Sequence, residues 1–139
     1  MIARDLMTPD PLTVTPQASI AEVLDLMREV DVRHVPVVQG GALVGMLSDR
    51  DLARVDFVRL LKVEGTDALW QELATPIARV MSSDVICVEP ETEVGDVIAL
   101  LLDHKIGALP VVESGTREVL GIISYVDVLR ALQGLLEED

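Results

Sequence analysis

The feature that most constrains the fold of this chain is an internal repeat. When the sequence is shifted by 74 positions, identical residues coincide through the first part of each copy, and after two extra residues in the second copy they coincide at a shift of 76. Self-similarity of this kind indicates two supersecondary units built on one plan. The matched pairs include Met7/Met81, Val14/Val88, Pro16/Pro90, Pro36/Pro110, Gly45/Gly121, Ser48/Ser124 and Asp51/Asp127.

Each copy is predicted to run strand, helix, strand, strand, helix. In the first copy Pro16 ends a short apolar strand, and apolar residues then recur with the 3.6-residue period of an amphipathic helix. Ser19 and Glu22 have the spacing of a capping box at the start of that helix. The expected segments are strand 12–14, helix 20–30, hairpin strands 34–38 and 43–47 and a helix from about 49, followed in the second copy by strand 85–88, helix 94–104, hairpin 108–124 and a helix from about 125 to Gly134.

The residues between the copies, about 55–80, are predicted to be helical, with breaks at Gly65 and Thr75-Pro76. This region carries Trp70 and Phe57, so we expect it to pack against the protein. The predicted division of the chain is therefore a first repeat at 1–64, a helical linker at 65–78 and a second repeat at 79–139.

Charge and aromatic content argue against nucleic acid as the main partner. A formal net charge of −13 would repel a phosphate backbone, and no stripe of Lys and Arg interrupts it. One Trp, one Tyr and one Phe offer little for base stacking. An anionic ligand must therefore be bound by a few local cations and by helix N-termini, where N–H groups are unpaired.

The cysteine content and the apolar segments indicate a cytoplasmic protein without membrane contact. Cys87 is the only cysteine, so neither an intramolecular disulfide nor a Cys/His zinc cluster is expected, and a small buried hydrophobe is the simplest interpretation. The first residues lack the apolar segment of a signal peptide. No uninterrupted apolar stretch reaches the roughly 18 residues that a membrane span needs.

The repeated motif with the most chemical content joins a strand to a helix. It runs glycine, two apolar residues, Ser, two variable residues and Asp, at 45–51 and again at 121–127. Taken alone it favours a helix cap, in which the Ser hydroxyl and the Asp carboxylate each accept a backbone N–H of the first turn. The same atoms can bind a nucleotide, because Ser and helix N–H groups hold a phosphate while the carboxylate accepts both hydroxyls of a ribose. Recurrence in both copies favours this second role, and the two roles are compatible.

Together these features resemble the CBS-domain family. The resemblance covers about residues 2–132, and it implies an α/β (α+β) fold of two tandem β-α-β-β-α repeats that pack sheet to sheet about a pseudo-twofold axis. It also implies clefts between the repeats for adenosyl ligands such as AMP, ADP, ATP, NAD or S-adenosylmethionine, as regulatory ligands with no cofactor required. The segments that carry it, besides the two glycine-to-Asp motifs, are Met7-Thr8-Pro9, Met81-Ser82-Ser83, Val35-Pro36-Val37-Val38 and Leu109-Pro110-Val111-Val112.

Carried over by position, the resemblance implies that Asp51 and Asp127 bind ribose hydroxyls, helped by a Ser three residues earlier. The base would lie among the first strand of each copy and the residues before each proline. Cys87 departs from the Thr or Ser common in the family, which weakens the base contact expected in the second copy. The full set of expected ligand-binding residues is Thr13, Val14, Arg33, His34, Val35, Pro36, Ser48, Asp51, Cys87, Val88, Ala108, Leu109, Pro110, Ser124 and Asp127.

The two clefts are expected to be unequal. Arg33 and His34 precede the proline of the first copy, whereas Gly107 and Ala108 stand at the equivalent positions. A phosphorylated ligand therefore gains charge-assisted hydrogen bonds only from the first copy. In the family, phosphate contacts often cross between repeats, so the resemblance places the stronger site at Asp127, with Arg33 and His34 on the phosphates. Without a ligand, positive charge on Arg33 and His34 would still be favourable, because both lie near the C-terminus of the preceding helix.

No motif for catalysis or metal binding stands out, since there is no P-loop, no G-x-G-x-x-G and no nucleophile at a recognisable spacing from a base, so we expect no enzyme. The expected function is a regulatory module that binds an adenosyl nucleotide, changes conformation and alters a separate, unidentified effector protein. The alternative is a ligand-independent dimerisation or docking module with degenerate clefts. The resemblance also implies a homodimer formed by helices 20–30 and 94–104 and by the helices after the two motifs. The physiological nucleotide, the occupancy of each cleft and the dimer orientation stay open.

Overall fold

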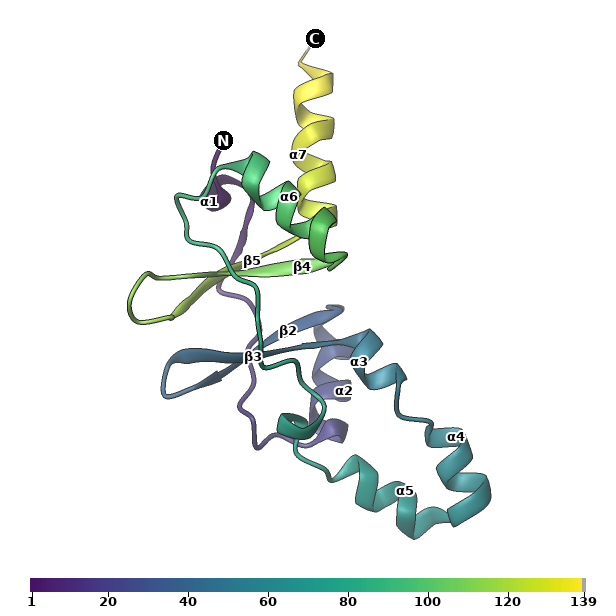
Figure 1. Cartoon of the computed structure of the whole chain (residues 1–139). Coiled ribbons are helices and arrows are strands. Elements are labelled where there is room, and N and C mark those ends of the chain that lie inside the picture. Colours follow the sequence, from purple (N-terminus) through teal and green to yellow (C-terminus); the bar gives the residue numbers. More distant parts are fainter. Residues whose placement is uncertain (139) are drawn as a thin grey trace. The chain divides into compact units, whose positions relative to one another are not determined.

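Each of the two units in the structure joins the body of one copy to the opening segment of the other. The structure is a computed structural model that describes residues 1–138. Unit 1 contains Met1–Pro11, Gly40–Leu43 and the chain from Ile86 onward, and unit 2 contains Leu12–Gln39 and Val44–Val85 (Figure 1). The compact units therefore differ from the sequence repeats, and the boundaries 1–64, 65–78 and 79–139 stay a prediction about the repeats.

Unit 2 is built on an amphipathic helix, α2 (Ile20–Val30), and a hairpin of β2 (His34–Gln39) and β3 (Ala42–Ser48). Ser19 caps α2 as predicted, because its Oγ accepts the Glu22 N–H at 3.1 Å. The buried face of the helix packs against the inward side chains of the hairpin. This core consists of Val14, Ile20, Val23, Met27, Val35, Val37, Leu47, Leu52 and Ile77.

The predicted first strand of each copy is reduced to a single parallel bridge. Val14 bridges Val37 and donates its N–H to the Pro36 carbonyl at 3.2 Å, and Val88 likewise bridges Val111 and donates to the Pro110 carbonyl at 3.0 Å. Pro16 and Pro90 follow two residues later, and proline has no N–H with which to continue a ladder. The first strands therefore lie where the sequence predicts them but are shorter than expected.

Between the two copies the chain forms a helical arm, which consists of α4 (Phe57–Arg59), the π-helix η1 (Leu60–Glu64) and α5 (Thr66–Leu73). Gly65 breaks the arm as predicted, with a φ of 91° that favours glycine. Pro76 precedes a short 3₁₀ turn, Ile77–Arg79. Phe57 and Leu73 pack against the unit 2 core, so the region packs against the protein as expected, although Trp70 itself is 66% exposed.

Unit 1 repeats the design with α6 (Val94–His104), β4 (Ala108–Val112), β5 (Val119–Ser124) and α7 (Tyr125–Glu137). It also contains α1 (Ala3–Leu6) and β1 (Thr8–Pro9) from the start of the chain. The sheet order is β1-β5-β4, both pairs are antiparallel, and Ala108 stands opposite Ser124. Its buried core consists of Ala3, Leu6, Val88, Val97, Leu101, Leu109, Val111 and Ile123.

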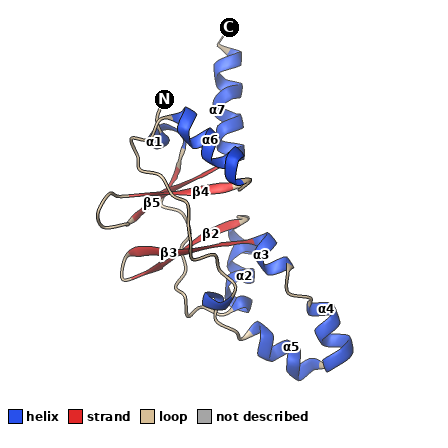
Figure 2. Cartoon of the chain, in the orientation of Figure 1, coloured by secondary structure: helices blue, strands red, loops and turns tan. Residues whose placement is uncertain are grey.

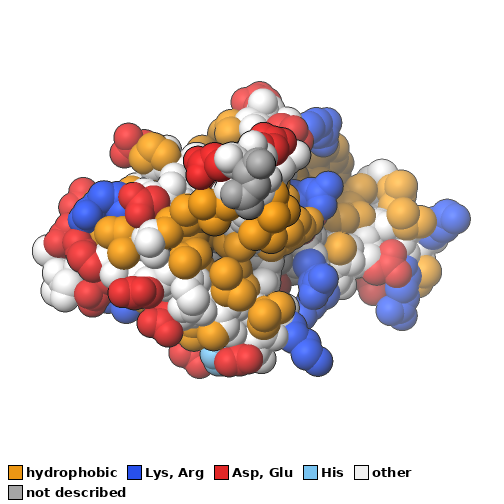
Figure 3. Space-filling view, turned by 90° about the horizontal axis from the view of Figure 1, so that it is seen from above, with side chains coloured by type: hydrophobic (Ala, Val, Ile, Leu, Met, Phe, Trp, Pro, Cys, Tyr) orange, Lys and Arg blue, Asp and Glu red, His pale blue; other side chains and the backbone are white. Residues whose placement is uncertain are grey.

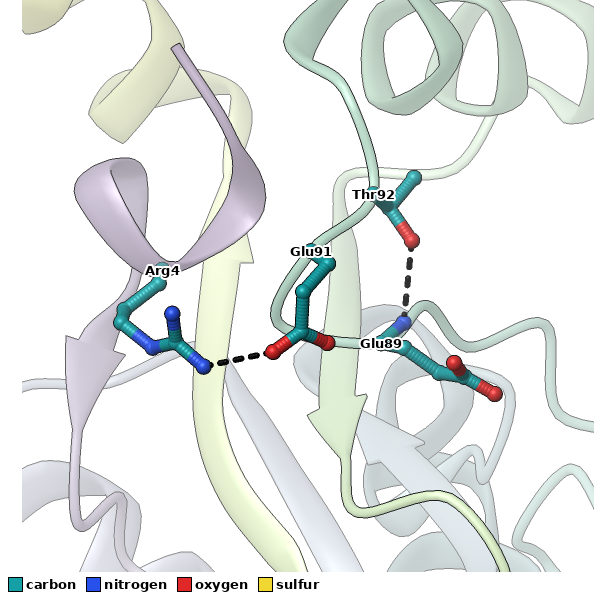
Figure 4. A network of polar contacts seen from close by, with 4 residues as sticks. All are labelled: Arg4, Glu89, Glu91 and Thr92. Carbon is teal, nitrogen blue, oxygen red and sulfur yellow. Dashed lines mark hydrogen bonds and ion pairs between the residues drawn. The ribbon is translucent and has the colours of Figure 1, made fainter.

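Polar contacts fix the first residues of the chain to unit 1. Arg4 forms an ion pair with Glu91 at 2.7 Å, and the Ala3 N–H donates to the Thr92 carbonyl at 2.7 Å. The Thr92 hydroxyl accepts the Glu89 N–H at 3.1 Å and so orders the same turn (Figure 4). The ion pair is exposed and contributes little by itself, so the backbone bonds and the buried Ala3 and Leu6 are the main attachment.

The first glycine of the repeated motif is needed where the opening segment passes over the sheet. A Cβ on Gly121 would lie 2.5 Å from Met7 Sδ and 2.9 Å from the Thr8 carbonyl oxygen. A Cβ on Gly45 would lie 2.5 Å from Met81 Sδ and 3.1 Å from the Ser82 carbonyl oxygen. Both glycines therefore let an opening segment from the other copy approach the strand, which the sequence pattern did not reveal.

Figure 2 shows strands and helices mixed in both units. The fold is α/β (α+β) with two tandem β-α-β-β-α repeats, as predicted, but the first strands are shorter than expected and α7 continues past Gly134 to Glu137. Within residues 1–138, no helix combines the length and the apolar character that a bilayer crossing requires.

Candidate functional site

In unit 1 the motif residues Ser124 and Asp127 form a reciprocal cap at the start of α7. Ser124 Oγ accepts the Asp127 N–H at 3.2 Å, and Asp127 Oδ2 accepts the Ser124 N–H at 2.8 Å and the Ser124 hydroxyl at 3.1 Å. The structural interpretation of the motif is confirmed. Asp127 Oδ1 has one contact, from the Thr8 hydroxyl at 3.5 Å, which is at the limit of a hydrogen bond. Asp127 Oδ1 can therefore still accept further hydrogen bonds.

Unit 2 contains the same cap on a shorter helix. Ser48 Oγ accepts the Asp51 N–H at 3.1 Å, and Asp51 Oδ2 accepts the Ser48 N–H at 2.9 Å. The helix that follows, α3 (Asp49–Ala53), has five residues, against 13 in α7. The two caps share the same backbone-to-side-chain hydrogen bonds, but the helix that follows the cap is shorter in unit 2 than in unit 1.

The backbone before each proline lies next to its cap. The Arg33 carbonyl accepts the Asp49 N–H at 2.9 Å, and the Gly107 carbonyl accepts the Tyr125 N–H at 3.1 Å. In unit 1 the β4–β5 register also sets Ala108 opposite Ser124. The predicted residues of each copy that lie before the proline and in the Ser-x-x-Asp motif are therefore brought together within one unit.

The residues predicted to surround the base lie mostly in the two cores. The side chains of Val35 and Leu109 are fully buried, so only their backbone is within reach of a ligand. Val14 and Val88 are also buried, whereas Thr13 and Cys87 are half-buried. Pro36, Ala108 and Pro110 are buried as well.

The charged residues of the first copy lie near the unit 2 cap. Burial lowers the pKa of His34 from its usual 6.5, Asp49 and Asp51 oppose this shift, and Arg33 and Arg50 add to it. Within the part of the chain that the structure describes, the only ion pair is Arg4 with Glu91. Arg33 and Arg50 are therefore without an acidic partner there and available to an anion.

A measurable hollow in unit 1 overlaps the predicted site only partly. Its volume is about 400 Å³, and Cys87 and Val88 are the only predicted residues among those that line it. The others are Glu89, Thr92, Leu100, Val112, Glu113, Ser114, Gly115 and Arg117. Ser124 and Asp127 do not line it, so this hollow does not bring the predicted residues of unit 1 together. Across residues 1–138, no three His, Cys, Asp or Glu side chains are placed to hold a metal ion.

The chain matches the CBS-domain family over residues 3–57 and 77–134, one range in each copy of the internal repeat. Over 125 residues it is 33% identical to the CBS domain-containing protein YhcV of Bacillus subtilis, a match that covers 90% of this chain and 81% of YhcV. Some relatives are much longer: the chain spans 23% of the inosine-5'-monophosphate dehydrogenase of Korarchaeum cryptofilum, at 32% identity over 127 residues.

Two solved structures are similar over nearly their whole lengths. A Vibrio cholerae protein assigned to acetoin utilization (AcuB) superposes with a TM-score of 0.80 at 31% identity, covering 99% of this chain and 93% of that protein. The structure of CBSX2 in complex with AMP superposes with a TM-score of 0.80 at 30% identity, covering 96% of this chain and 97% of CBSX2. This chain therefore belongs to the CBS-domain family, of which it carries two tandem repeats.

Proposed function

We propose that this chain is a regulatory module that binds an adenosyl nucleotide and thereby alters a partner protein. The observation that carries the proposal is the cap at α7, where Asp127 Oδ2 caps the helix and Oδ1 accepts only the Thr8 hydroxyl at 3.5 Å. CBSX2, which is 30% identical, binds AMP. Such a nucleotide is a regulatory ligand in this proposal, and the chain needs no cofactor.

A ribose suits Asp127 because adjacent hydroxyls are donors and a carboxylate is an acceptor. Two hydrogen bonds from Ser124 already hold the carboxylate, so little side-chain freedom is lost when a ligand binds. A hydrogen bond to a charged group contributes about 1.5–3 kcal/mol. The α7 N-terminus adds partial positive charge for an anionic ligand.

The remaining predicted residues are proposed to contact the base and the phosphates of the nucleotide. The adenine is proposed to contact the backbone at Val88 and Leu109, together with the half-buried Cys87. Arg33 has a free guanidinium, and a phosphate beside His34 would favour its protonated form against the effect of burial. That Arg33 and His34 serve the ligand held by Asp127 stays a prediction, which an Arg33→Gln variant tests.

The module is proposed to act as a cytoplasmic homodimer. Exposed apolar side chains on α7 and α6, such as Leu132 and Leu102, need cover in water, and a second copy supplies it. Ligand binding would favour one of two conformations, and a separate effector protein with different affinity for the two states would respond.

The test is a thermal-shift titration of the purified chain with AMP, ADP, ATP, NAD and S-adenosylmethionine, with GMP as the control. A ligand at a hundred times its dissociation constant adds about 2.7 kcal/mol to stability, so a saturable, adenine-selective rise in Tm is expected. The absence of any shift would contradict the proposal. It would favour the alternative, a ligand-independent dimerisation or docking module, which the exposed leucines of α7 also suit.

A further inference from the structure

The hollow in unit 1 combines two carboxylates with one guanidinium. Its volume of about 400 Å³ lies within the usual range of small-molecule sites. Glu89, Glu113 and Arg117 line it, and none of the three forms an ion pair with the described part of the chain. Figure 4 shows the Glu89 carboxylate turned away from the ion pair of Arg4 with Glu91. The hollow therefore offers two negative groups and one positive group to a ligand.

All three charges are departures from the internal repeat. Thr15 and Gln39 stand in the first copy where the second copy has Glu89 and Glu113. Arg117 has no counterpart, because it is one of the two residues inserted in the second copy. The first copy forms its hairpin of β2 and β3 without these residues. The repeat fold therefore does not require the three charges.

Backbone contacts hold Arg117 in a conformation that is rare for its residue type. Its φ is 61°, in the left-handed region that residues other than glycine seldom adopt. Its N–H donates to the Glu113 carbonyl at 3.0 Å, and its carbonyl accepts the Leu43 N–H at 2.9 Å. Nε donates weakly to the Leu43 carbonyl at 3.4 Å, and the terminal guanidinium nitrogens have no acidic partner among the described residues. The base of this side chain is held, and its tip is available to an anion.

Apolar side chains form much of the remaining surface of the hollow. Leu100 from α6 and Val112 from the end of β4 line it together with Val88. Thr92 also lines it, but its hydroxyl accepts the Glu89 N–H at 3.1 Å. An apolar surface beside charged groups suits a ligand whose charges are separated by methylene groups.

The charges around the hollow favour a ligand with a net positive charge. The two lining carboxylates outnumber the one guanidinium. Glu93 and Glu118 are exposed close by in the sequence, whereas Glu91 is already paired with Arg4. Figure 3 shows acidic side chains distributed over the face seen from the end of α7, in keeping with the net charge of −13. A nucleotide phosphate would be repelled here, so this hollow is distinct from the site proposed at Asp127.

We propose that the hollow binds a free α-amino acid with a basic side chain, such as lysine. Arg117 binds the α-carboxylate, and Glu89 and Glu113 bind the two ammonium groups. The methylene stem of lysine packs on Leu100 and Val112. The single positive charge of lysine balances the excess negative charge of the lining. The inference goes beyond the proposed function and does not depend on nucleotide binding.

Calorimetric titration of the full chain with lysine and two analogues tests the chemistry of the site. Lysine is expected to bind at one site per chain with a Kd below about 1 mM. Norleucine lacks the side-chain ammonium and cadaverine lacks the carboxylate, so each should bind at least about tenfold more weakly. No saturable binding of lysine, or equal affinity for lysine and either analogue, would overturn the proposal.

Variants that each remove one charge test the location of the site. Arg117→Gln should weaken lysine binding about tenfold but should not weaken cadaverine binding, because cadaverine has no carboxylate for the guanidinium. Glu89→Gln and Glu113→Gln should each weaken lysine binding about tenfold as well. The matched control, Glu118→Gln, removes an exposed carboxylate that does not line the hollow and should leave lysine affinity unchanged. An unchanged Tm without ligand shows that each variant is folded.

Two results with these variants would contradict the location. Lysine binding that is unaffected by Arg117→Gln would show that the guanidinium does not hold the carboxylate. A loss in Glu118→Gln equal to that in Glu113→Gln would show general attraction of a cation to an acidic surface. Either result would overturn the assignment of this hollow as an amino-acid site.

Discussion

Units 1 and 2 begin a helix with the same Ser-x-x-Asp hydrogen bonds, yet the surroundings of the two caps differ. In unit 2 the cap precedes the five-residue α3 and lies beside Arg33 and His34. In unit 1 it precedes the 13-residue α7 and lies beside the uncharged Gly107 and Ala108. The motif fixes how a helix starts, whereas the residues around it decide what each cap can bind.

The comparison also bears on the two roles of the motif, helix capping and nucleotide binding, which the sequence alone does not separate. Asp51 and Asp127 both cap through Oδ2, so the cap alone would explain the repeat of the motif. The positive charges of the first copy, which Gly107 and Ala108 do not match, distinguish the two copies in charge. The predictions below use paired variants, one in each unit, to measure that difference.

The largest expected effect is on nucleotide affinity. Asp127→Asn keeps an oxygen to accept the Ser124 N–H but loses the carboxylate charge offered to a ribose, so AMP affinity should fall about 10- to 100-fold. Asp51→Asn should weaken binding less than about threefold, because the stronger site is assigned to Asp127. Isothermal titration calorimetry measures both. Equal losses in the two variants would contradict the assignment of one dominant site.

The second largest expected effect is on the free energy of unfolding, when the glycine of each motif is replaced by alanine. Gly121→Ala should destabilise the protein by about 1–3 kcal/mol, because the Cβ would meet the Thr8 carbonyl oxygen at 2.9 Å. Gly45→Ala should cost less, since the nearest backbone atom, the Ser82 carbonyl oxygen, would be 3.1 Å away and the remaining contact is with a flexible Met81 side chain. Urea unfolding measures both free energies. If Gly121→Ala were as stable as the wild type, the close approach of the first residues would be wrong.

A smaller effect is expected from loss of a cap hydroxyl. Ser124→Ala and Ser48→Ala each remove the acceptor for an Asp N–H and should each cost about 1 kcal/mol. Because α7 has 13 residues and α3 has five, only Ser124→Ala should also lower helix content by circular dichroism. Identical spectra for the two variants would show that α7 does not depend on its cap.

The smallest expected effect is a pH dependence confined to the first copy. Burial lowers the pKa of His34 in the folded protein below 6.5, so the unfolded chain binds a proton first and stability falls as the pH drops below that value. His34→Ala, which introduces the residue found in the second copy, should flatten this dependence. Unfolding in urea at pH 7.5 and pH 5.5 makes the comparison, and parallel pH profiles for the two proteins would rule out His34 as the cause.

Features set by local sequence were predicted well. The helix that Ser19 caps and the two Ser-x-x-Asp caps all depend on residues within a few positions of one another. The break at Gly65 is likewise local, since it depends on a positive φ.

Features set by distant contacts were not predictable in the same way. The attachment of Met7 to β5 and of Met81 to β3 joins segments that lie far apart in the sequence, and no local pattern specifies it. The exposure of Trp70 is similar, because an aromatic side chain is normally buried unless a surface is kept for a partner. For the candidate site, the caps were predictable, but the burial of Val35 and Leu109 was not, because it depends on how each core packs.

Calorimetric titration of AMP into the purified wild-type chain tests most directly whether the two repeats form one dominant nucleotide site. We expect a saturable binding curve with one dominant site per chain, whose affinity Asp127→Asn lowers about 10- to 100-fold. No saturable binding, or two equal sites per chain that survive Asp127→Asn, would contradict the proposed function and the difference between the two caps.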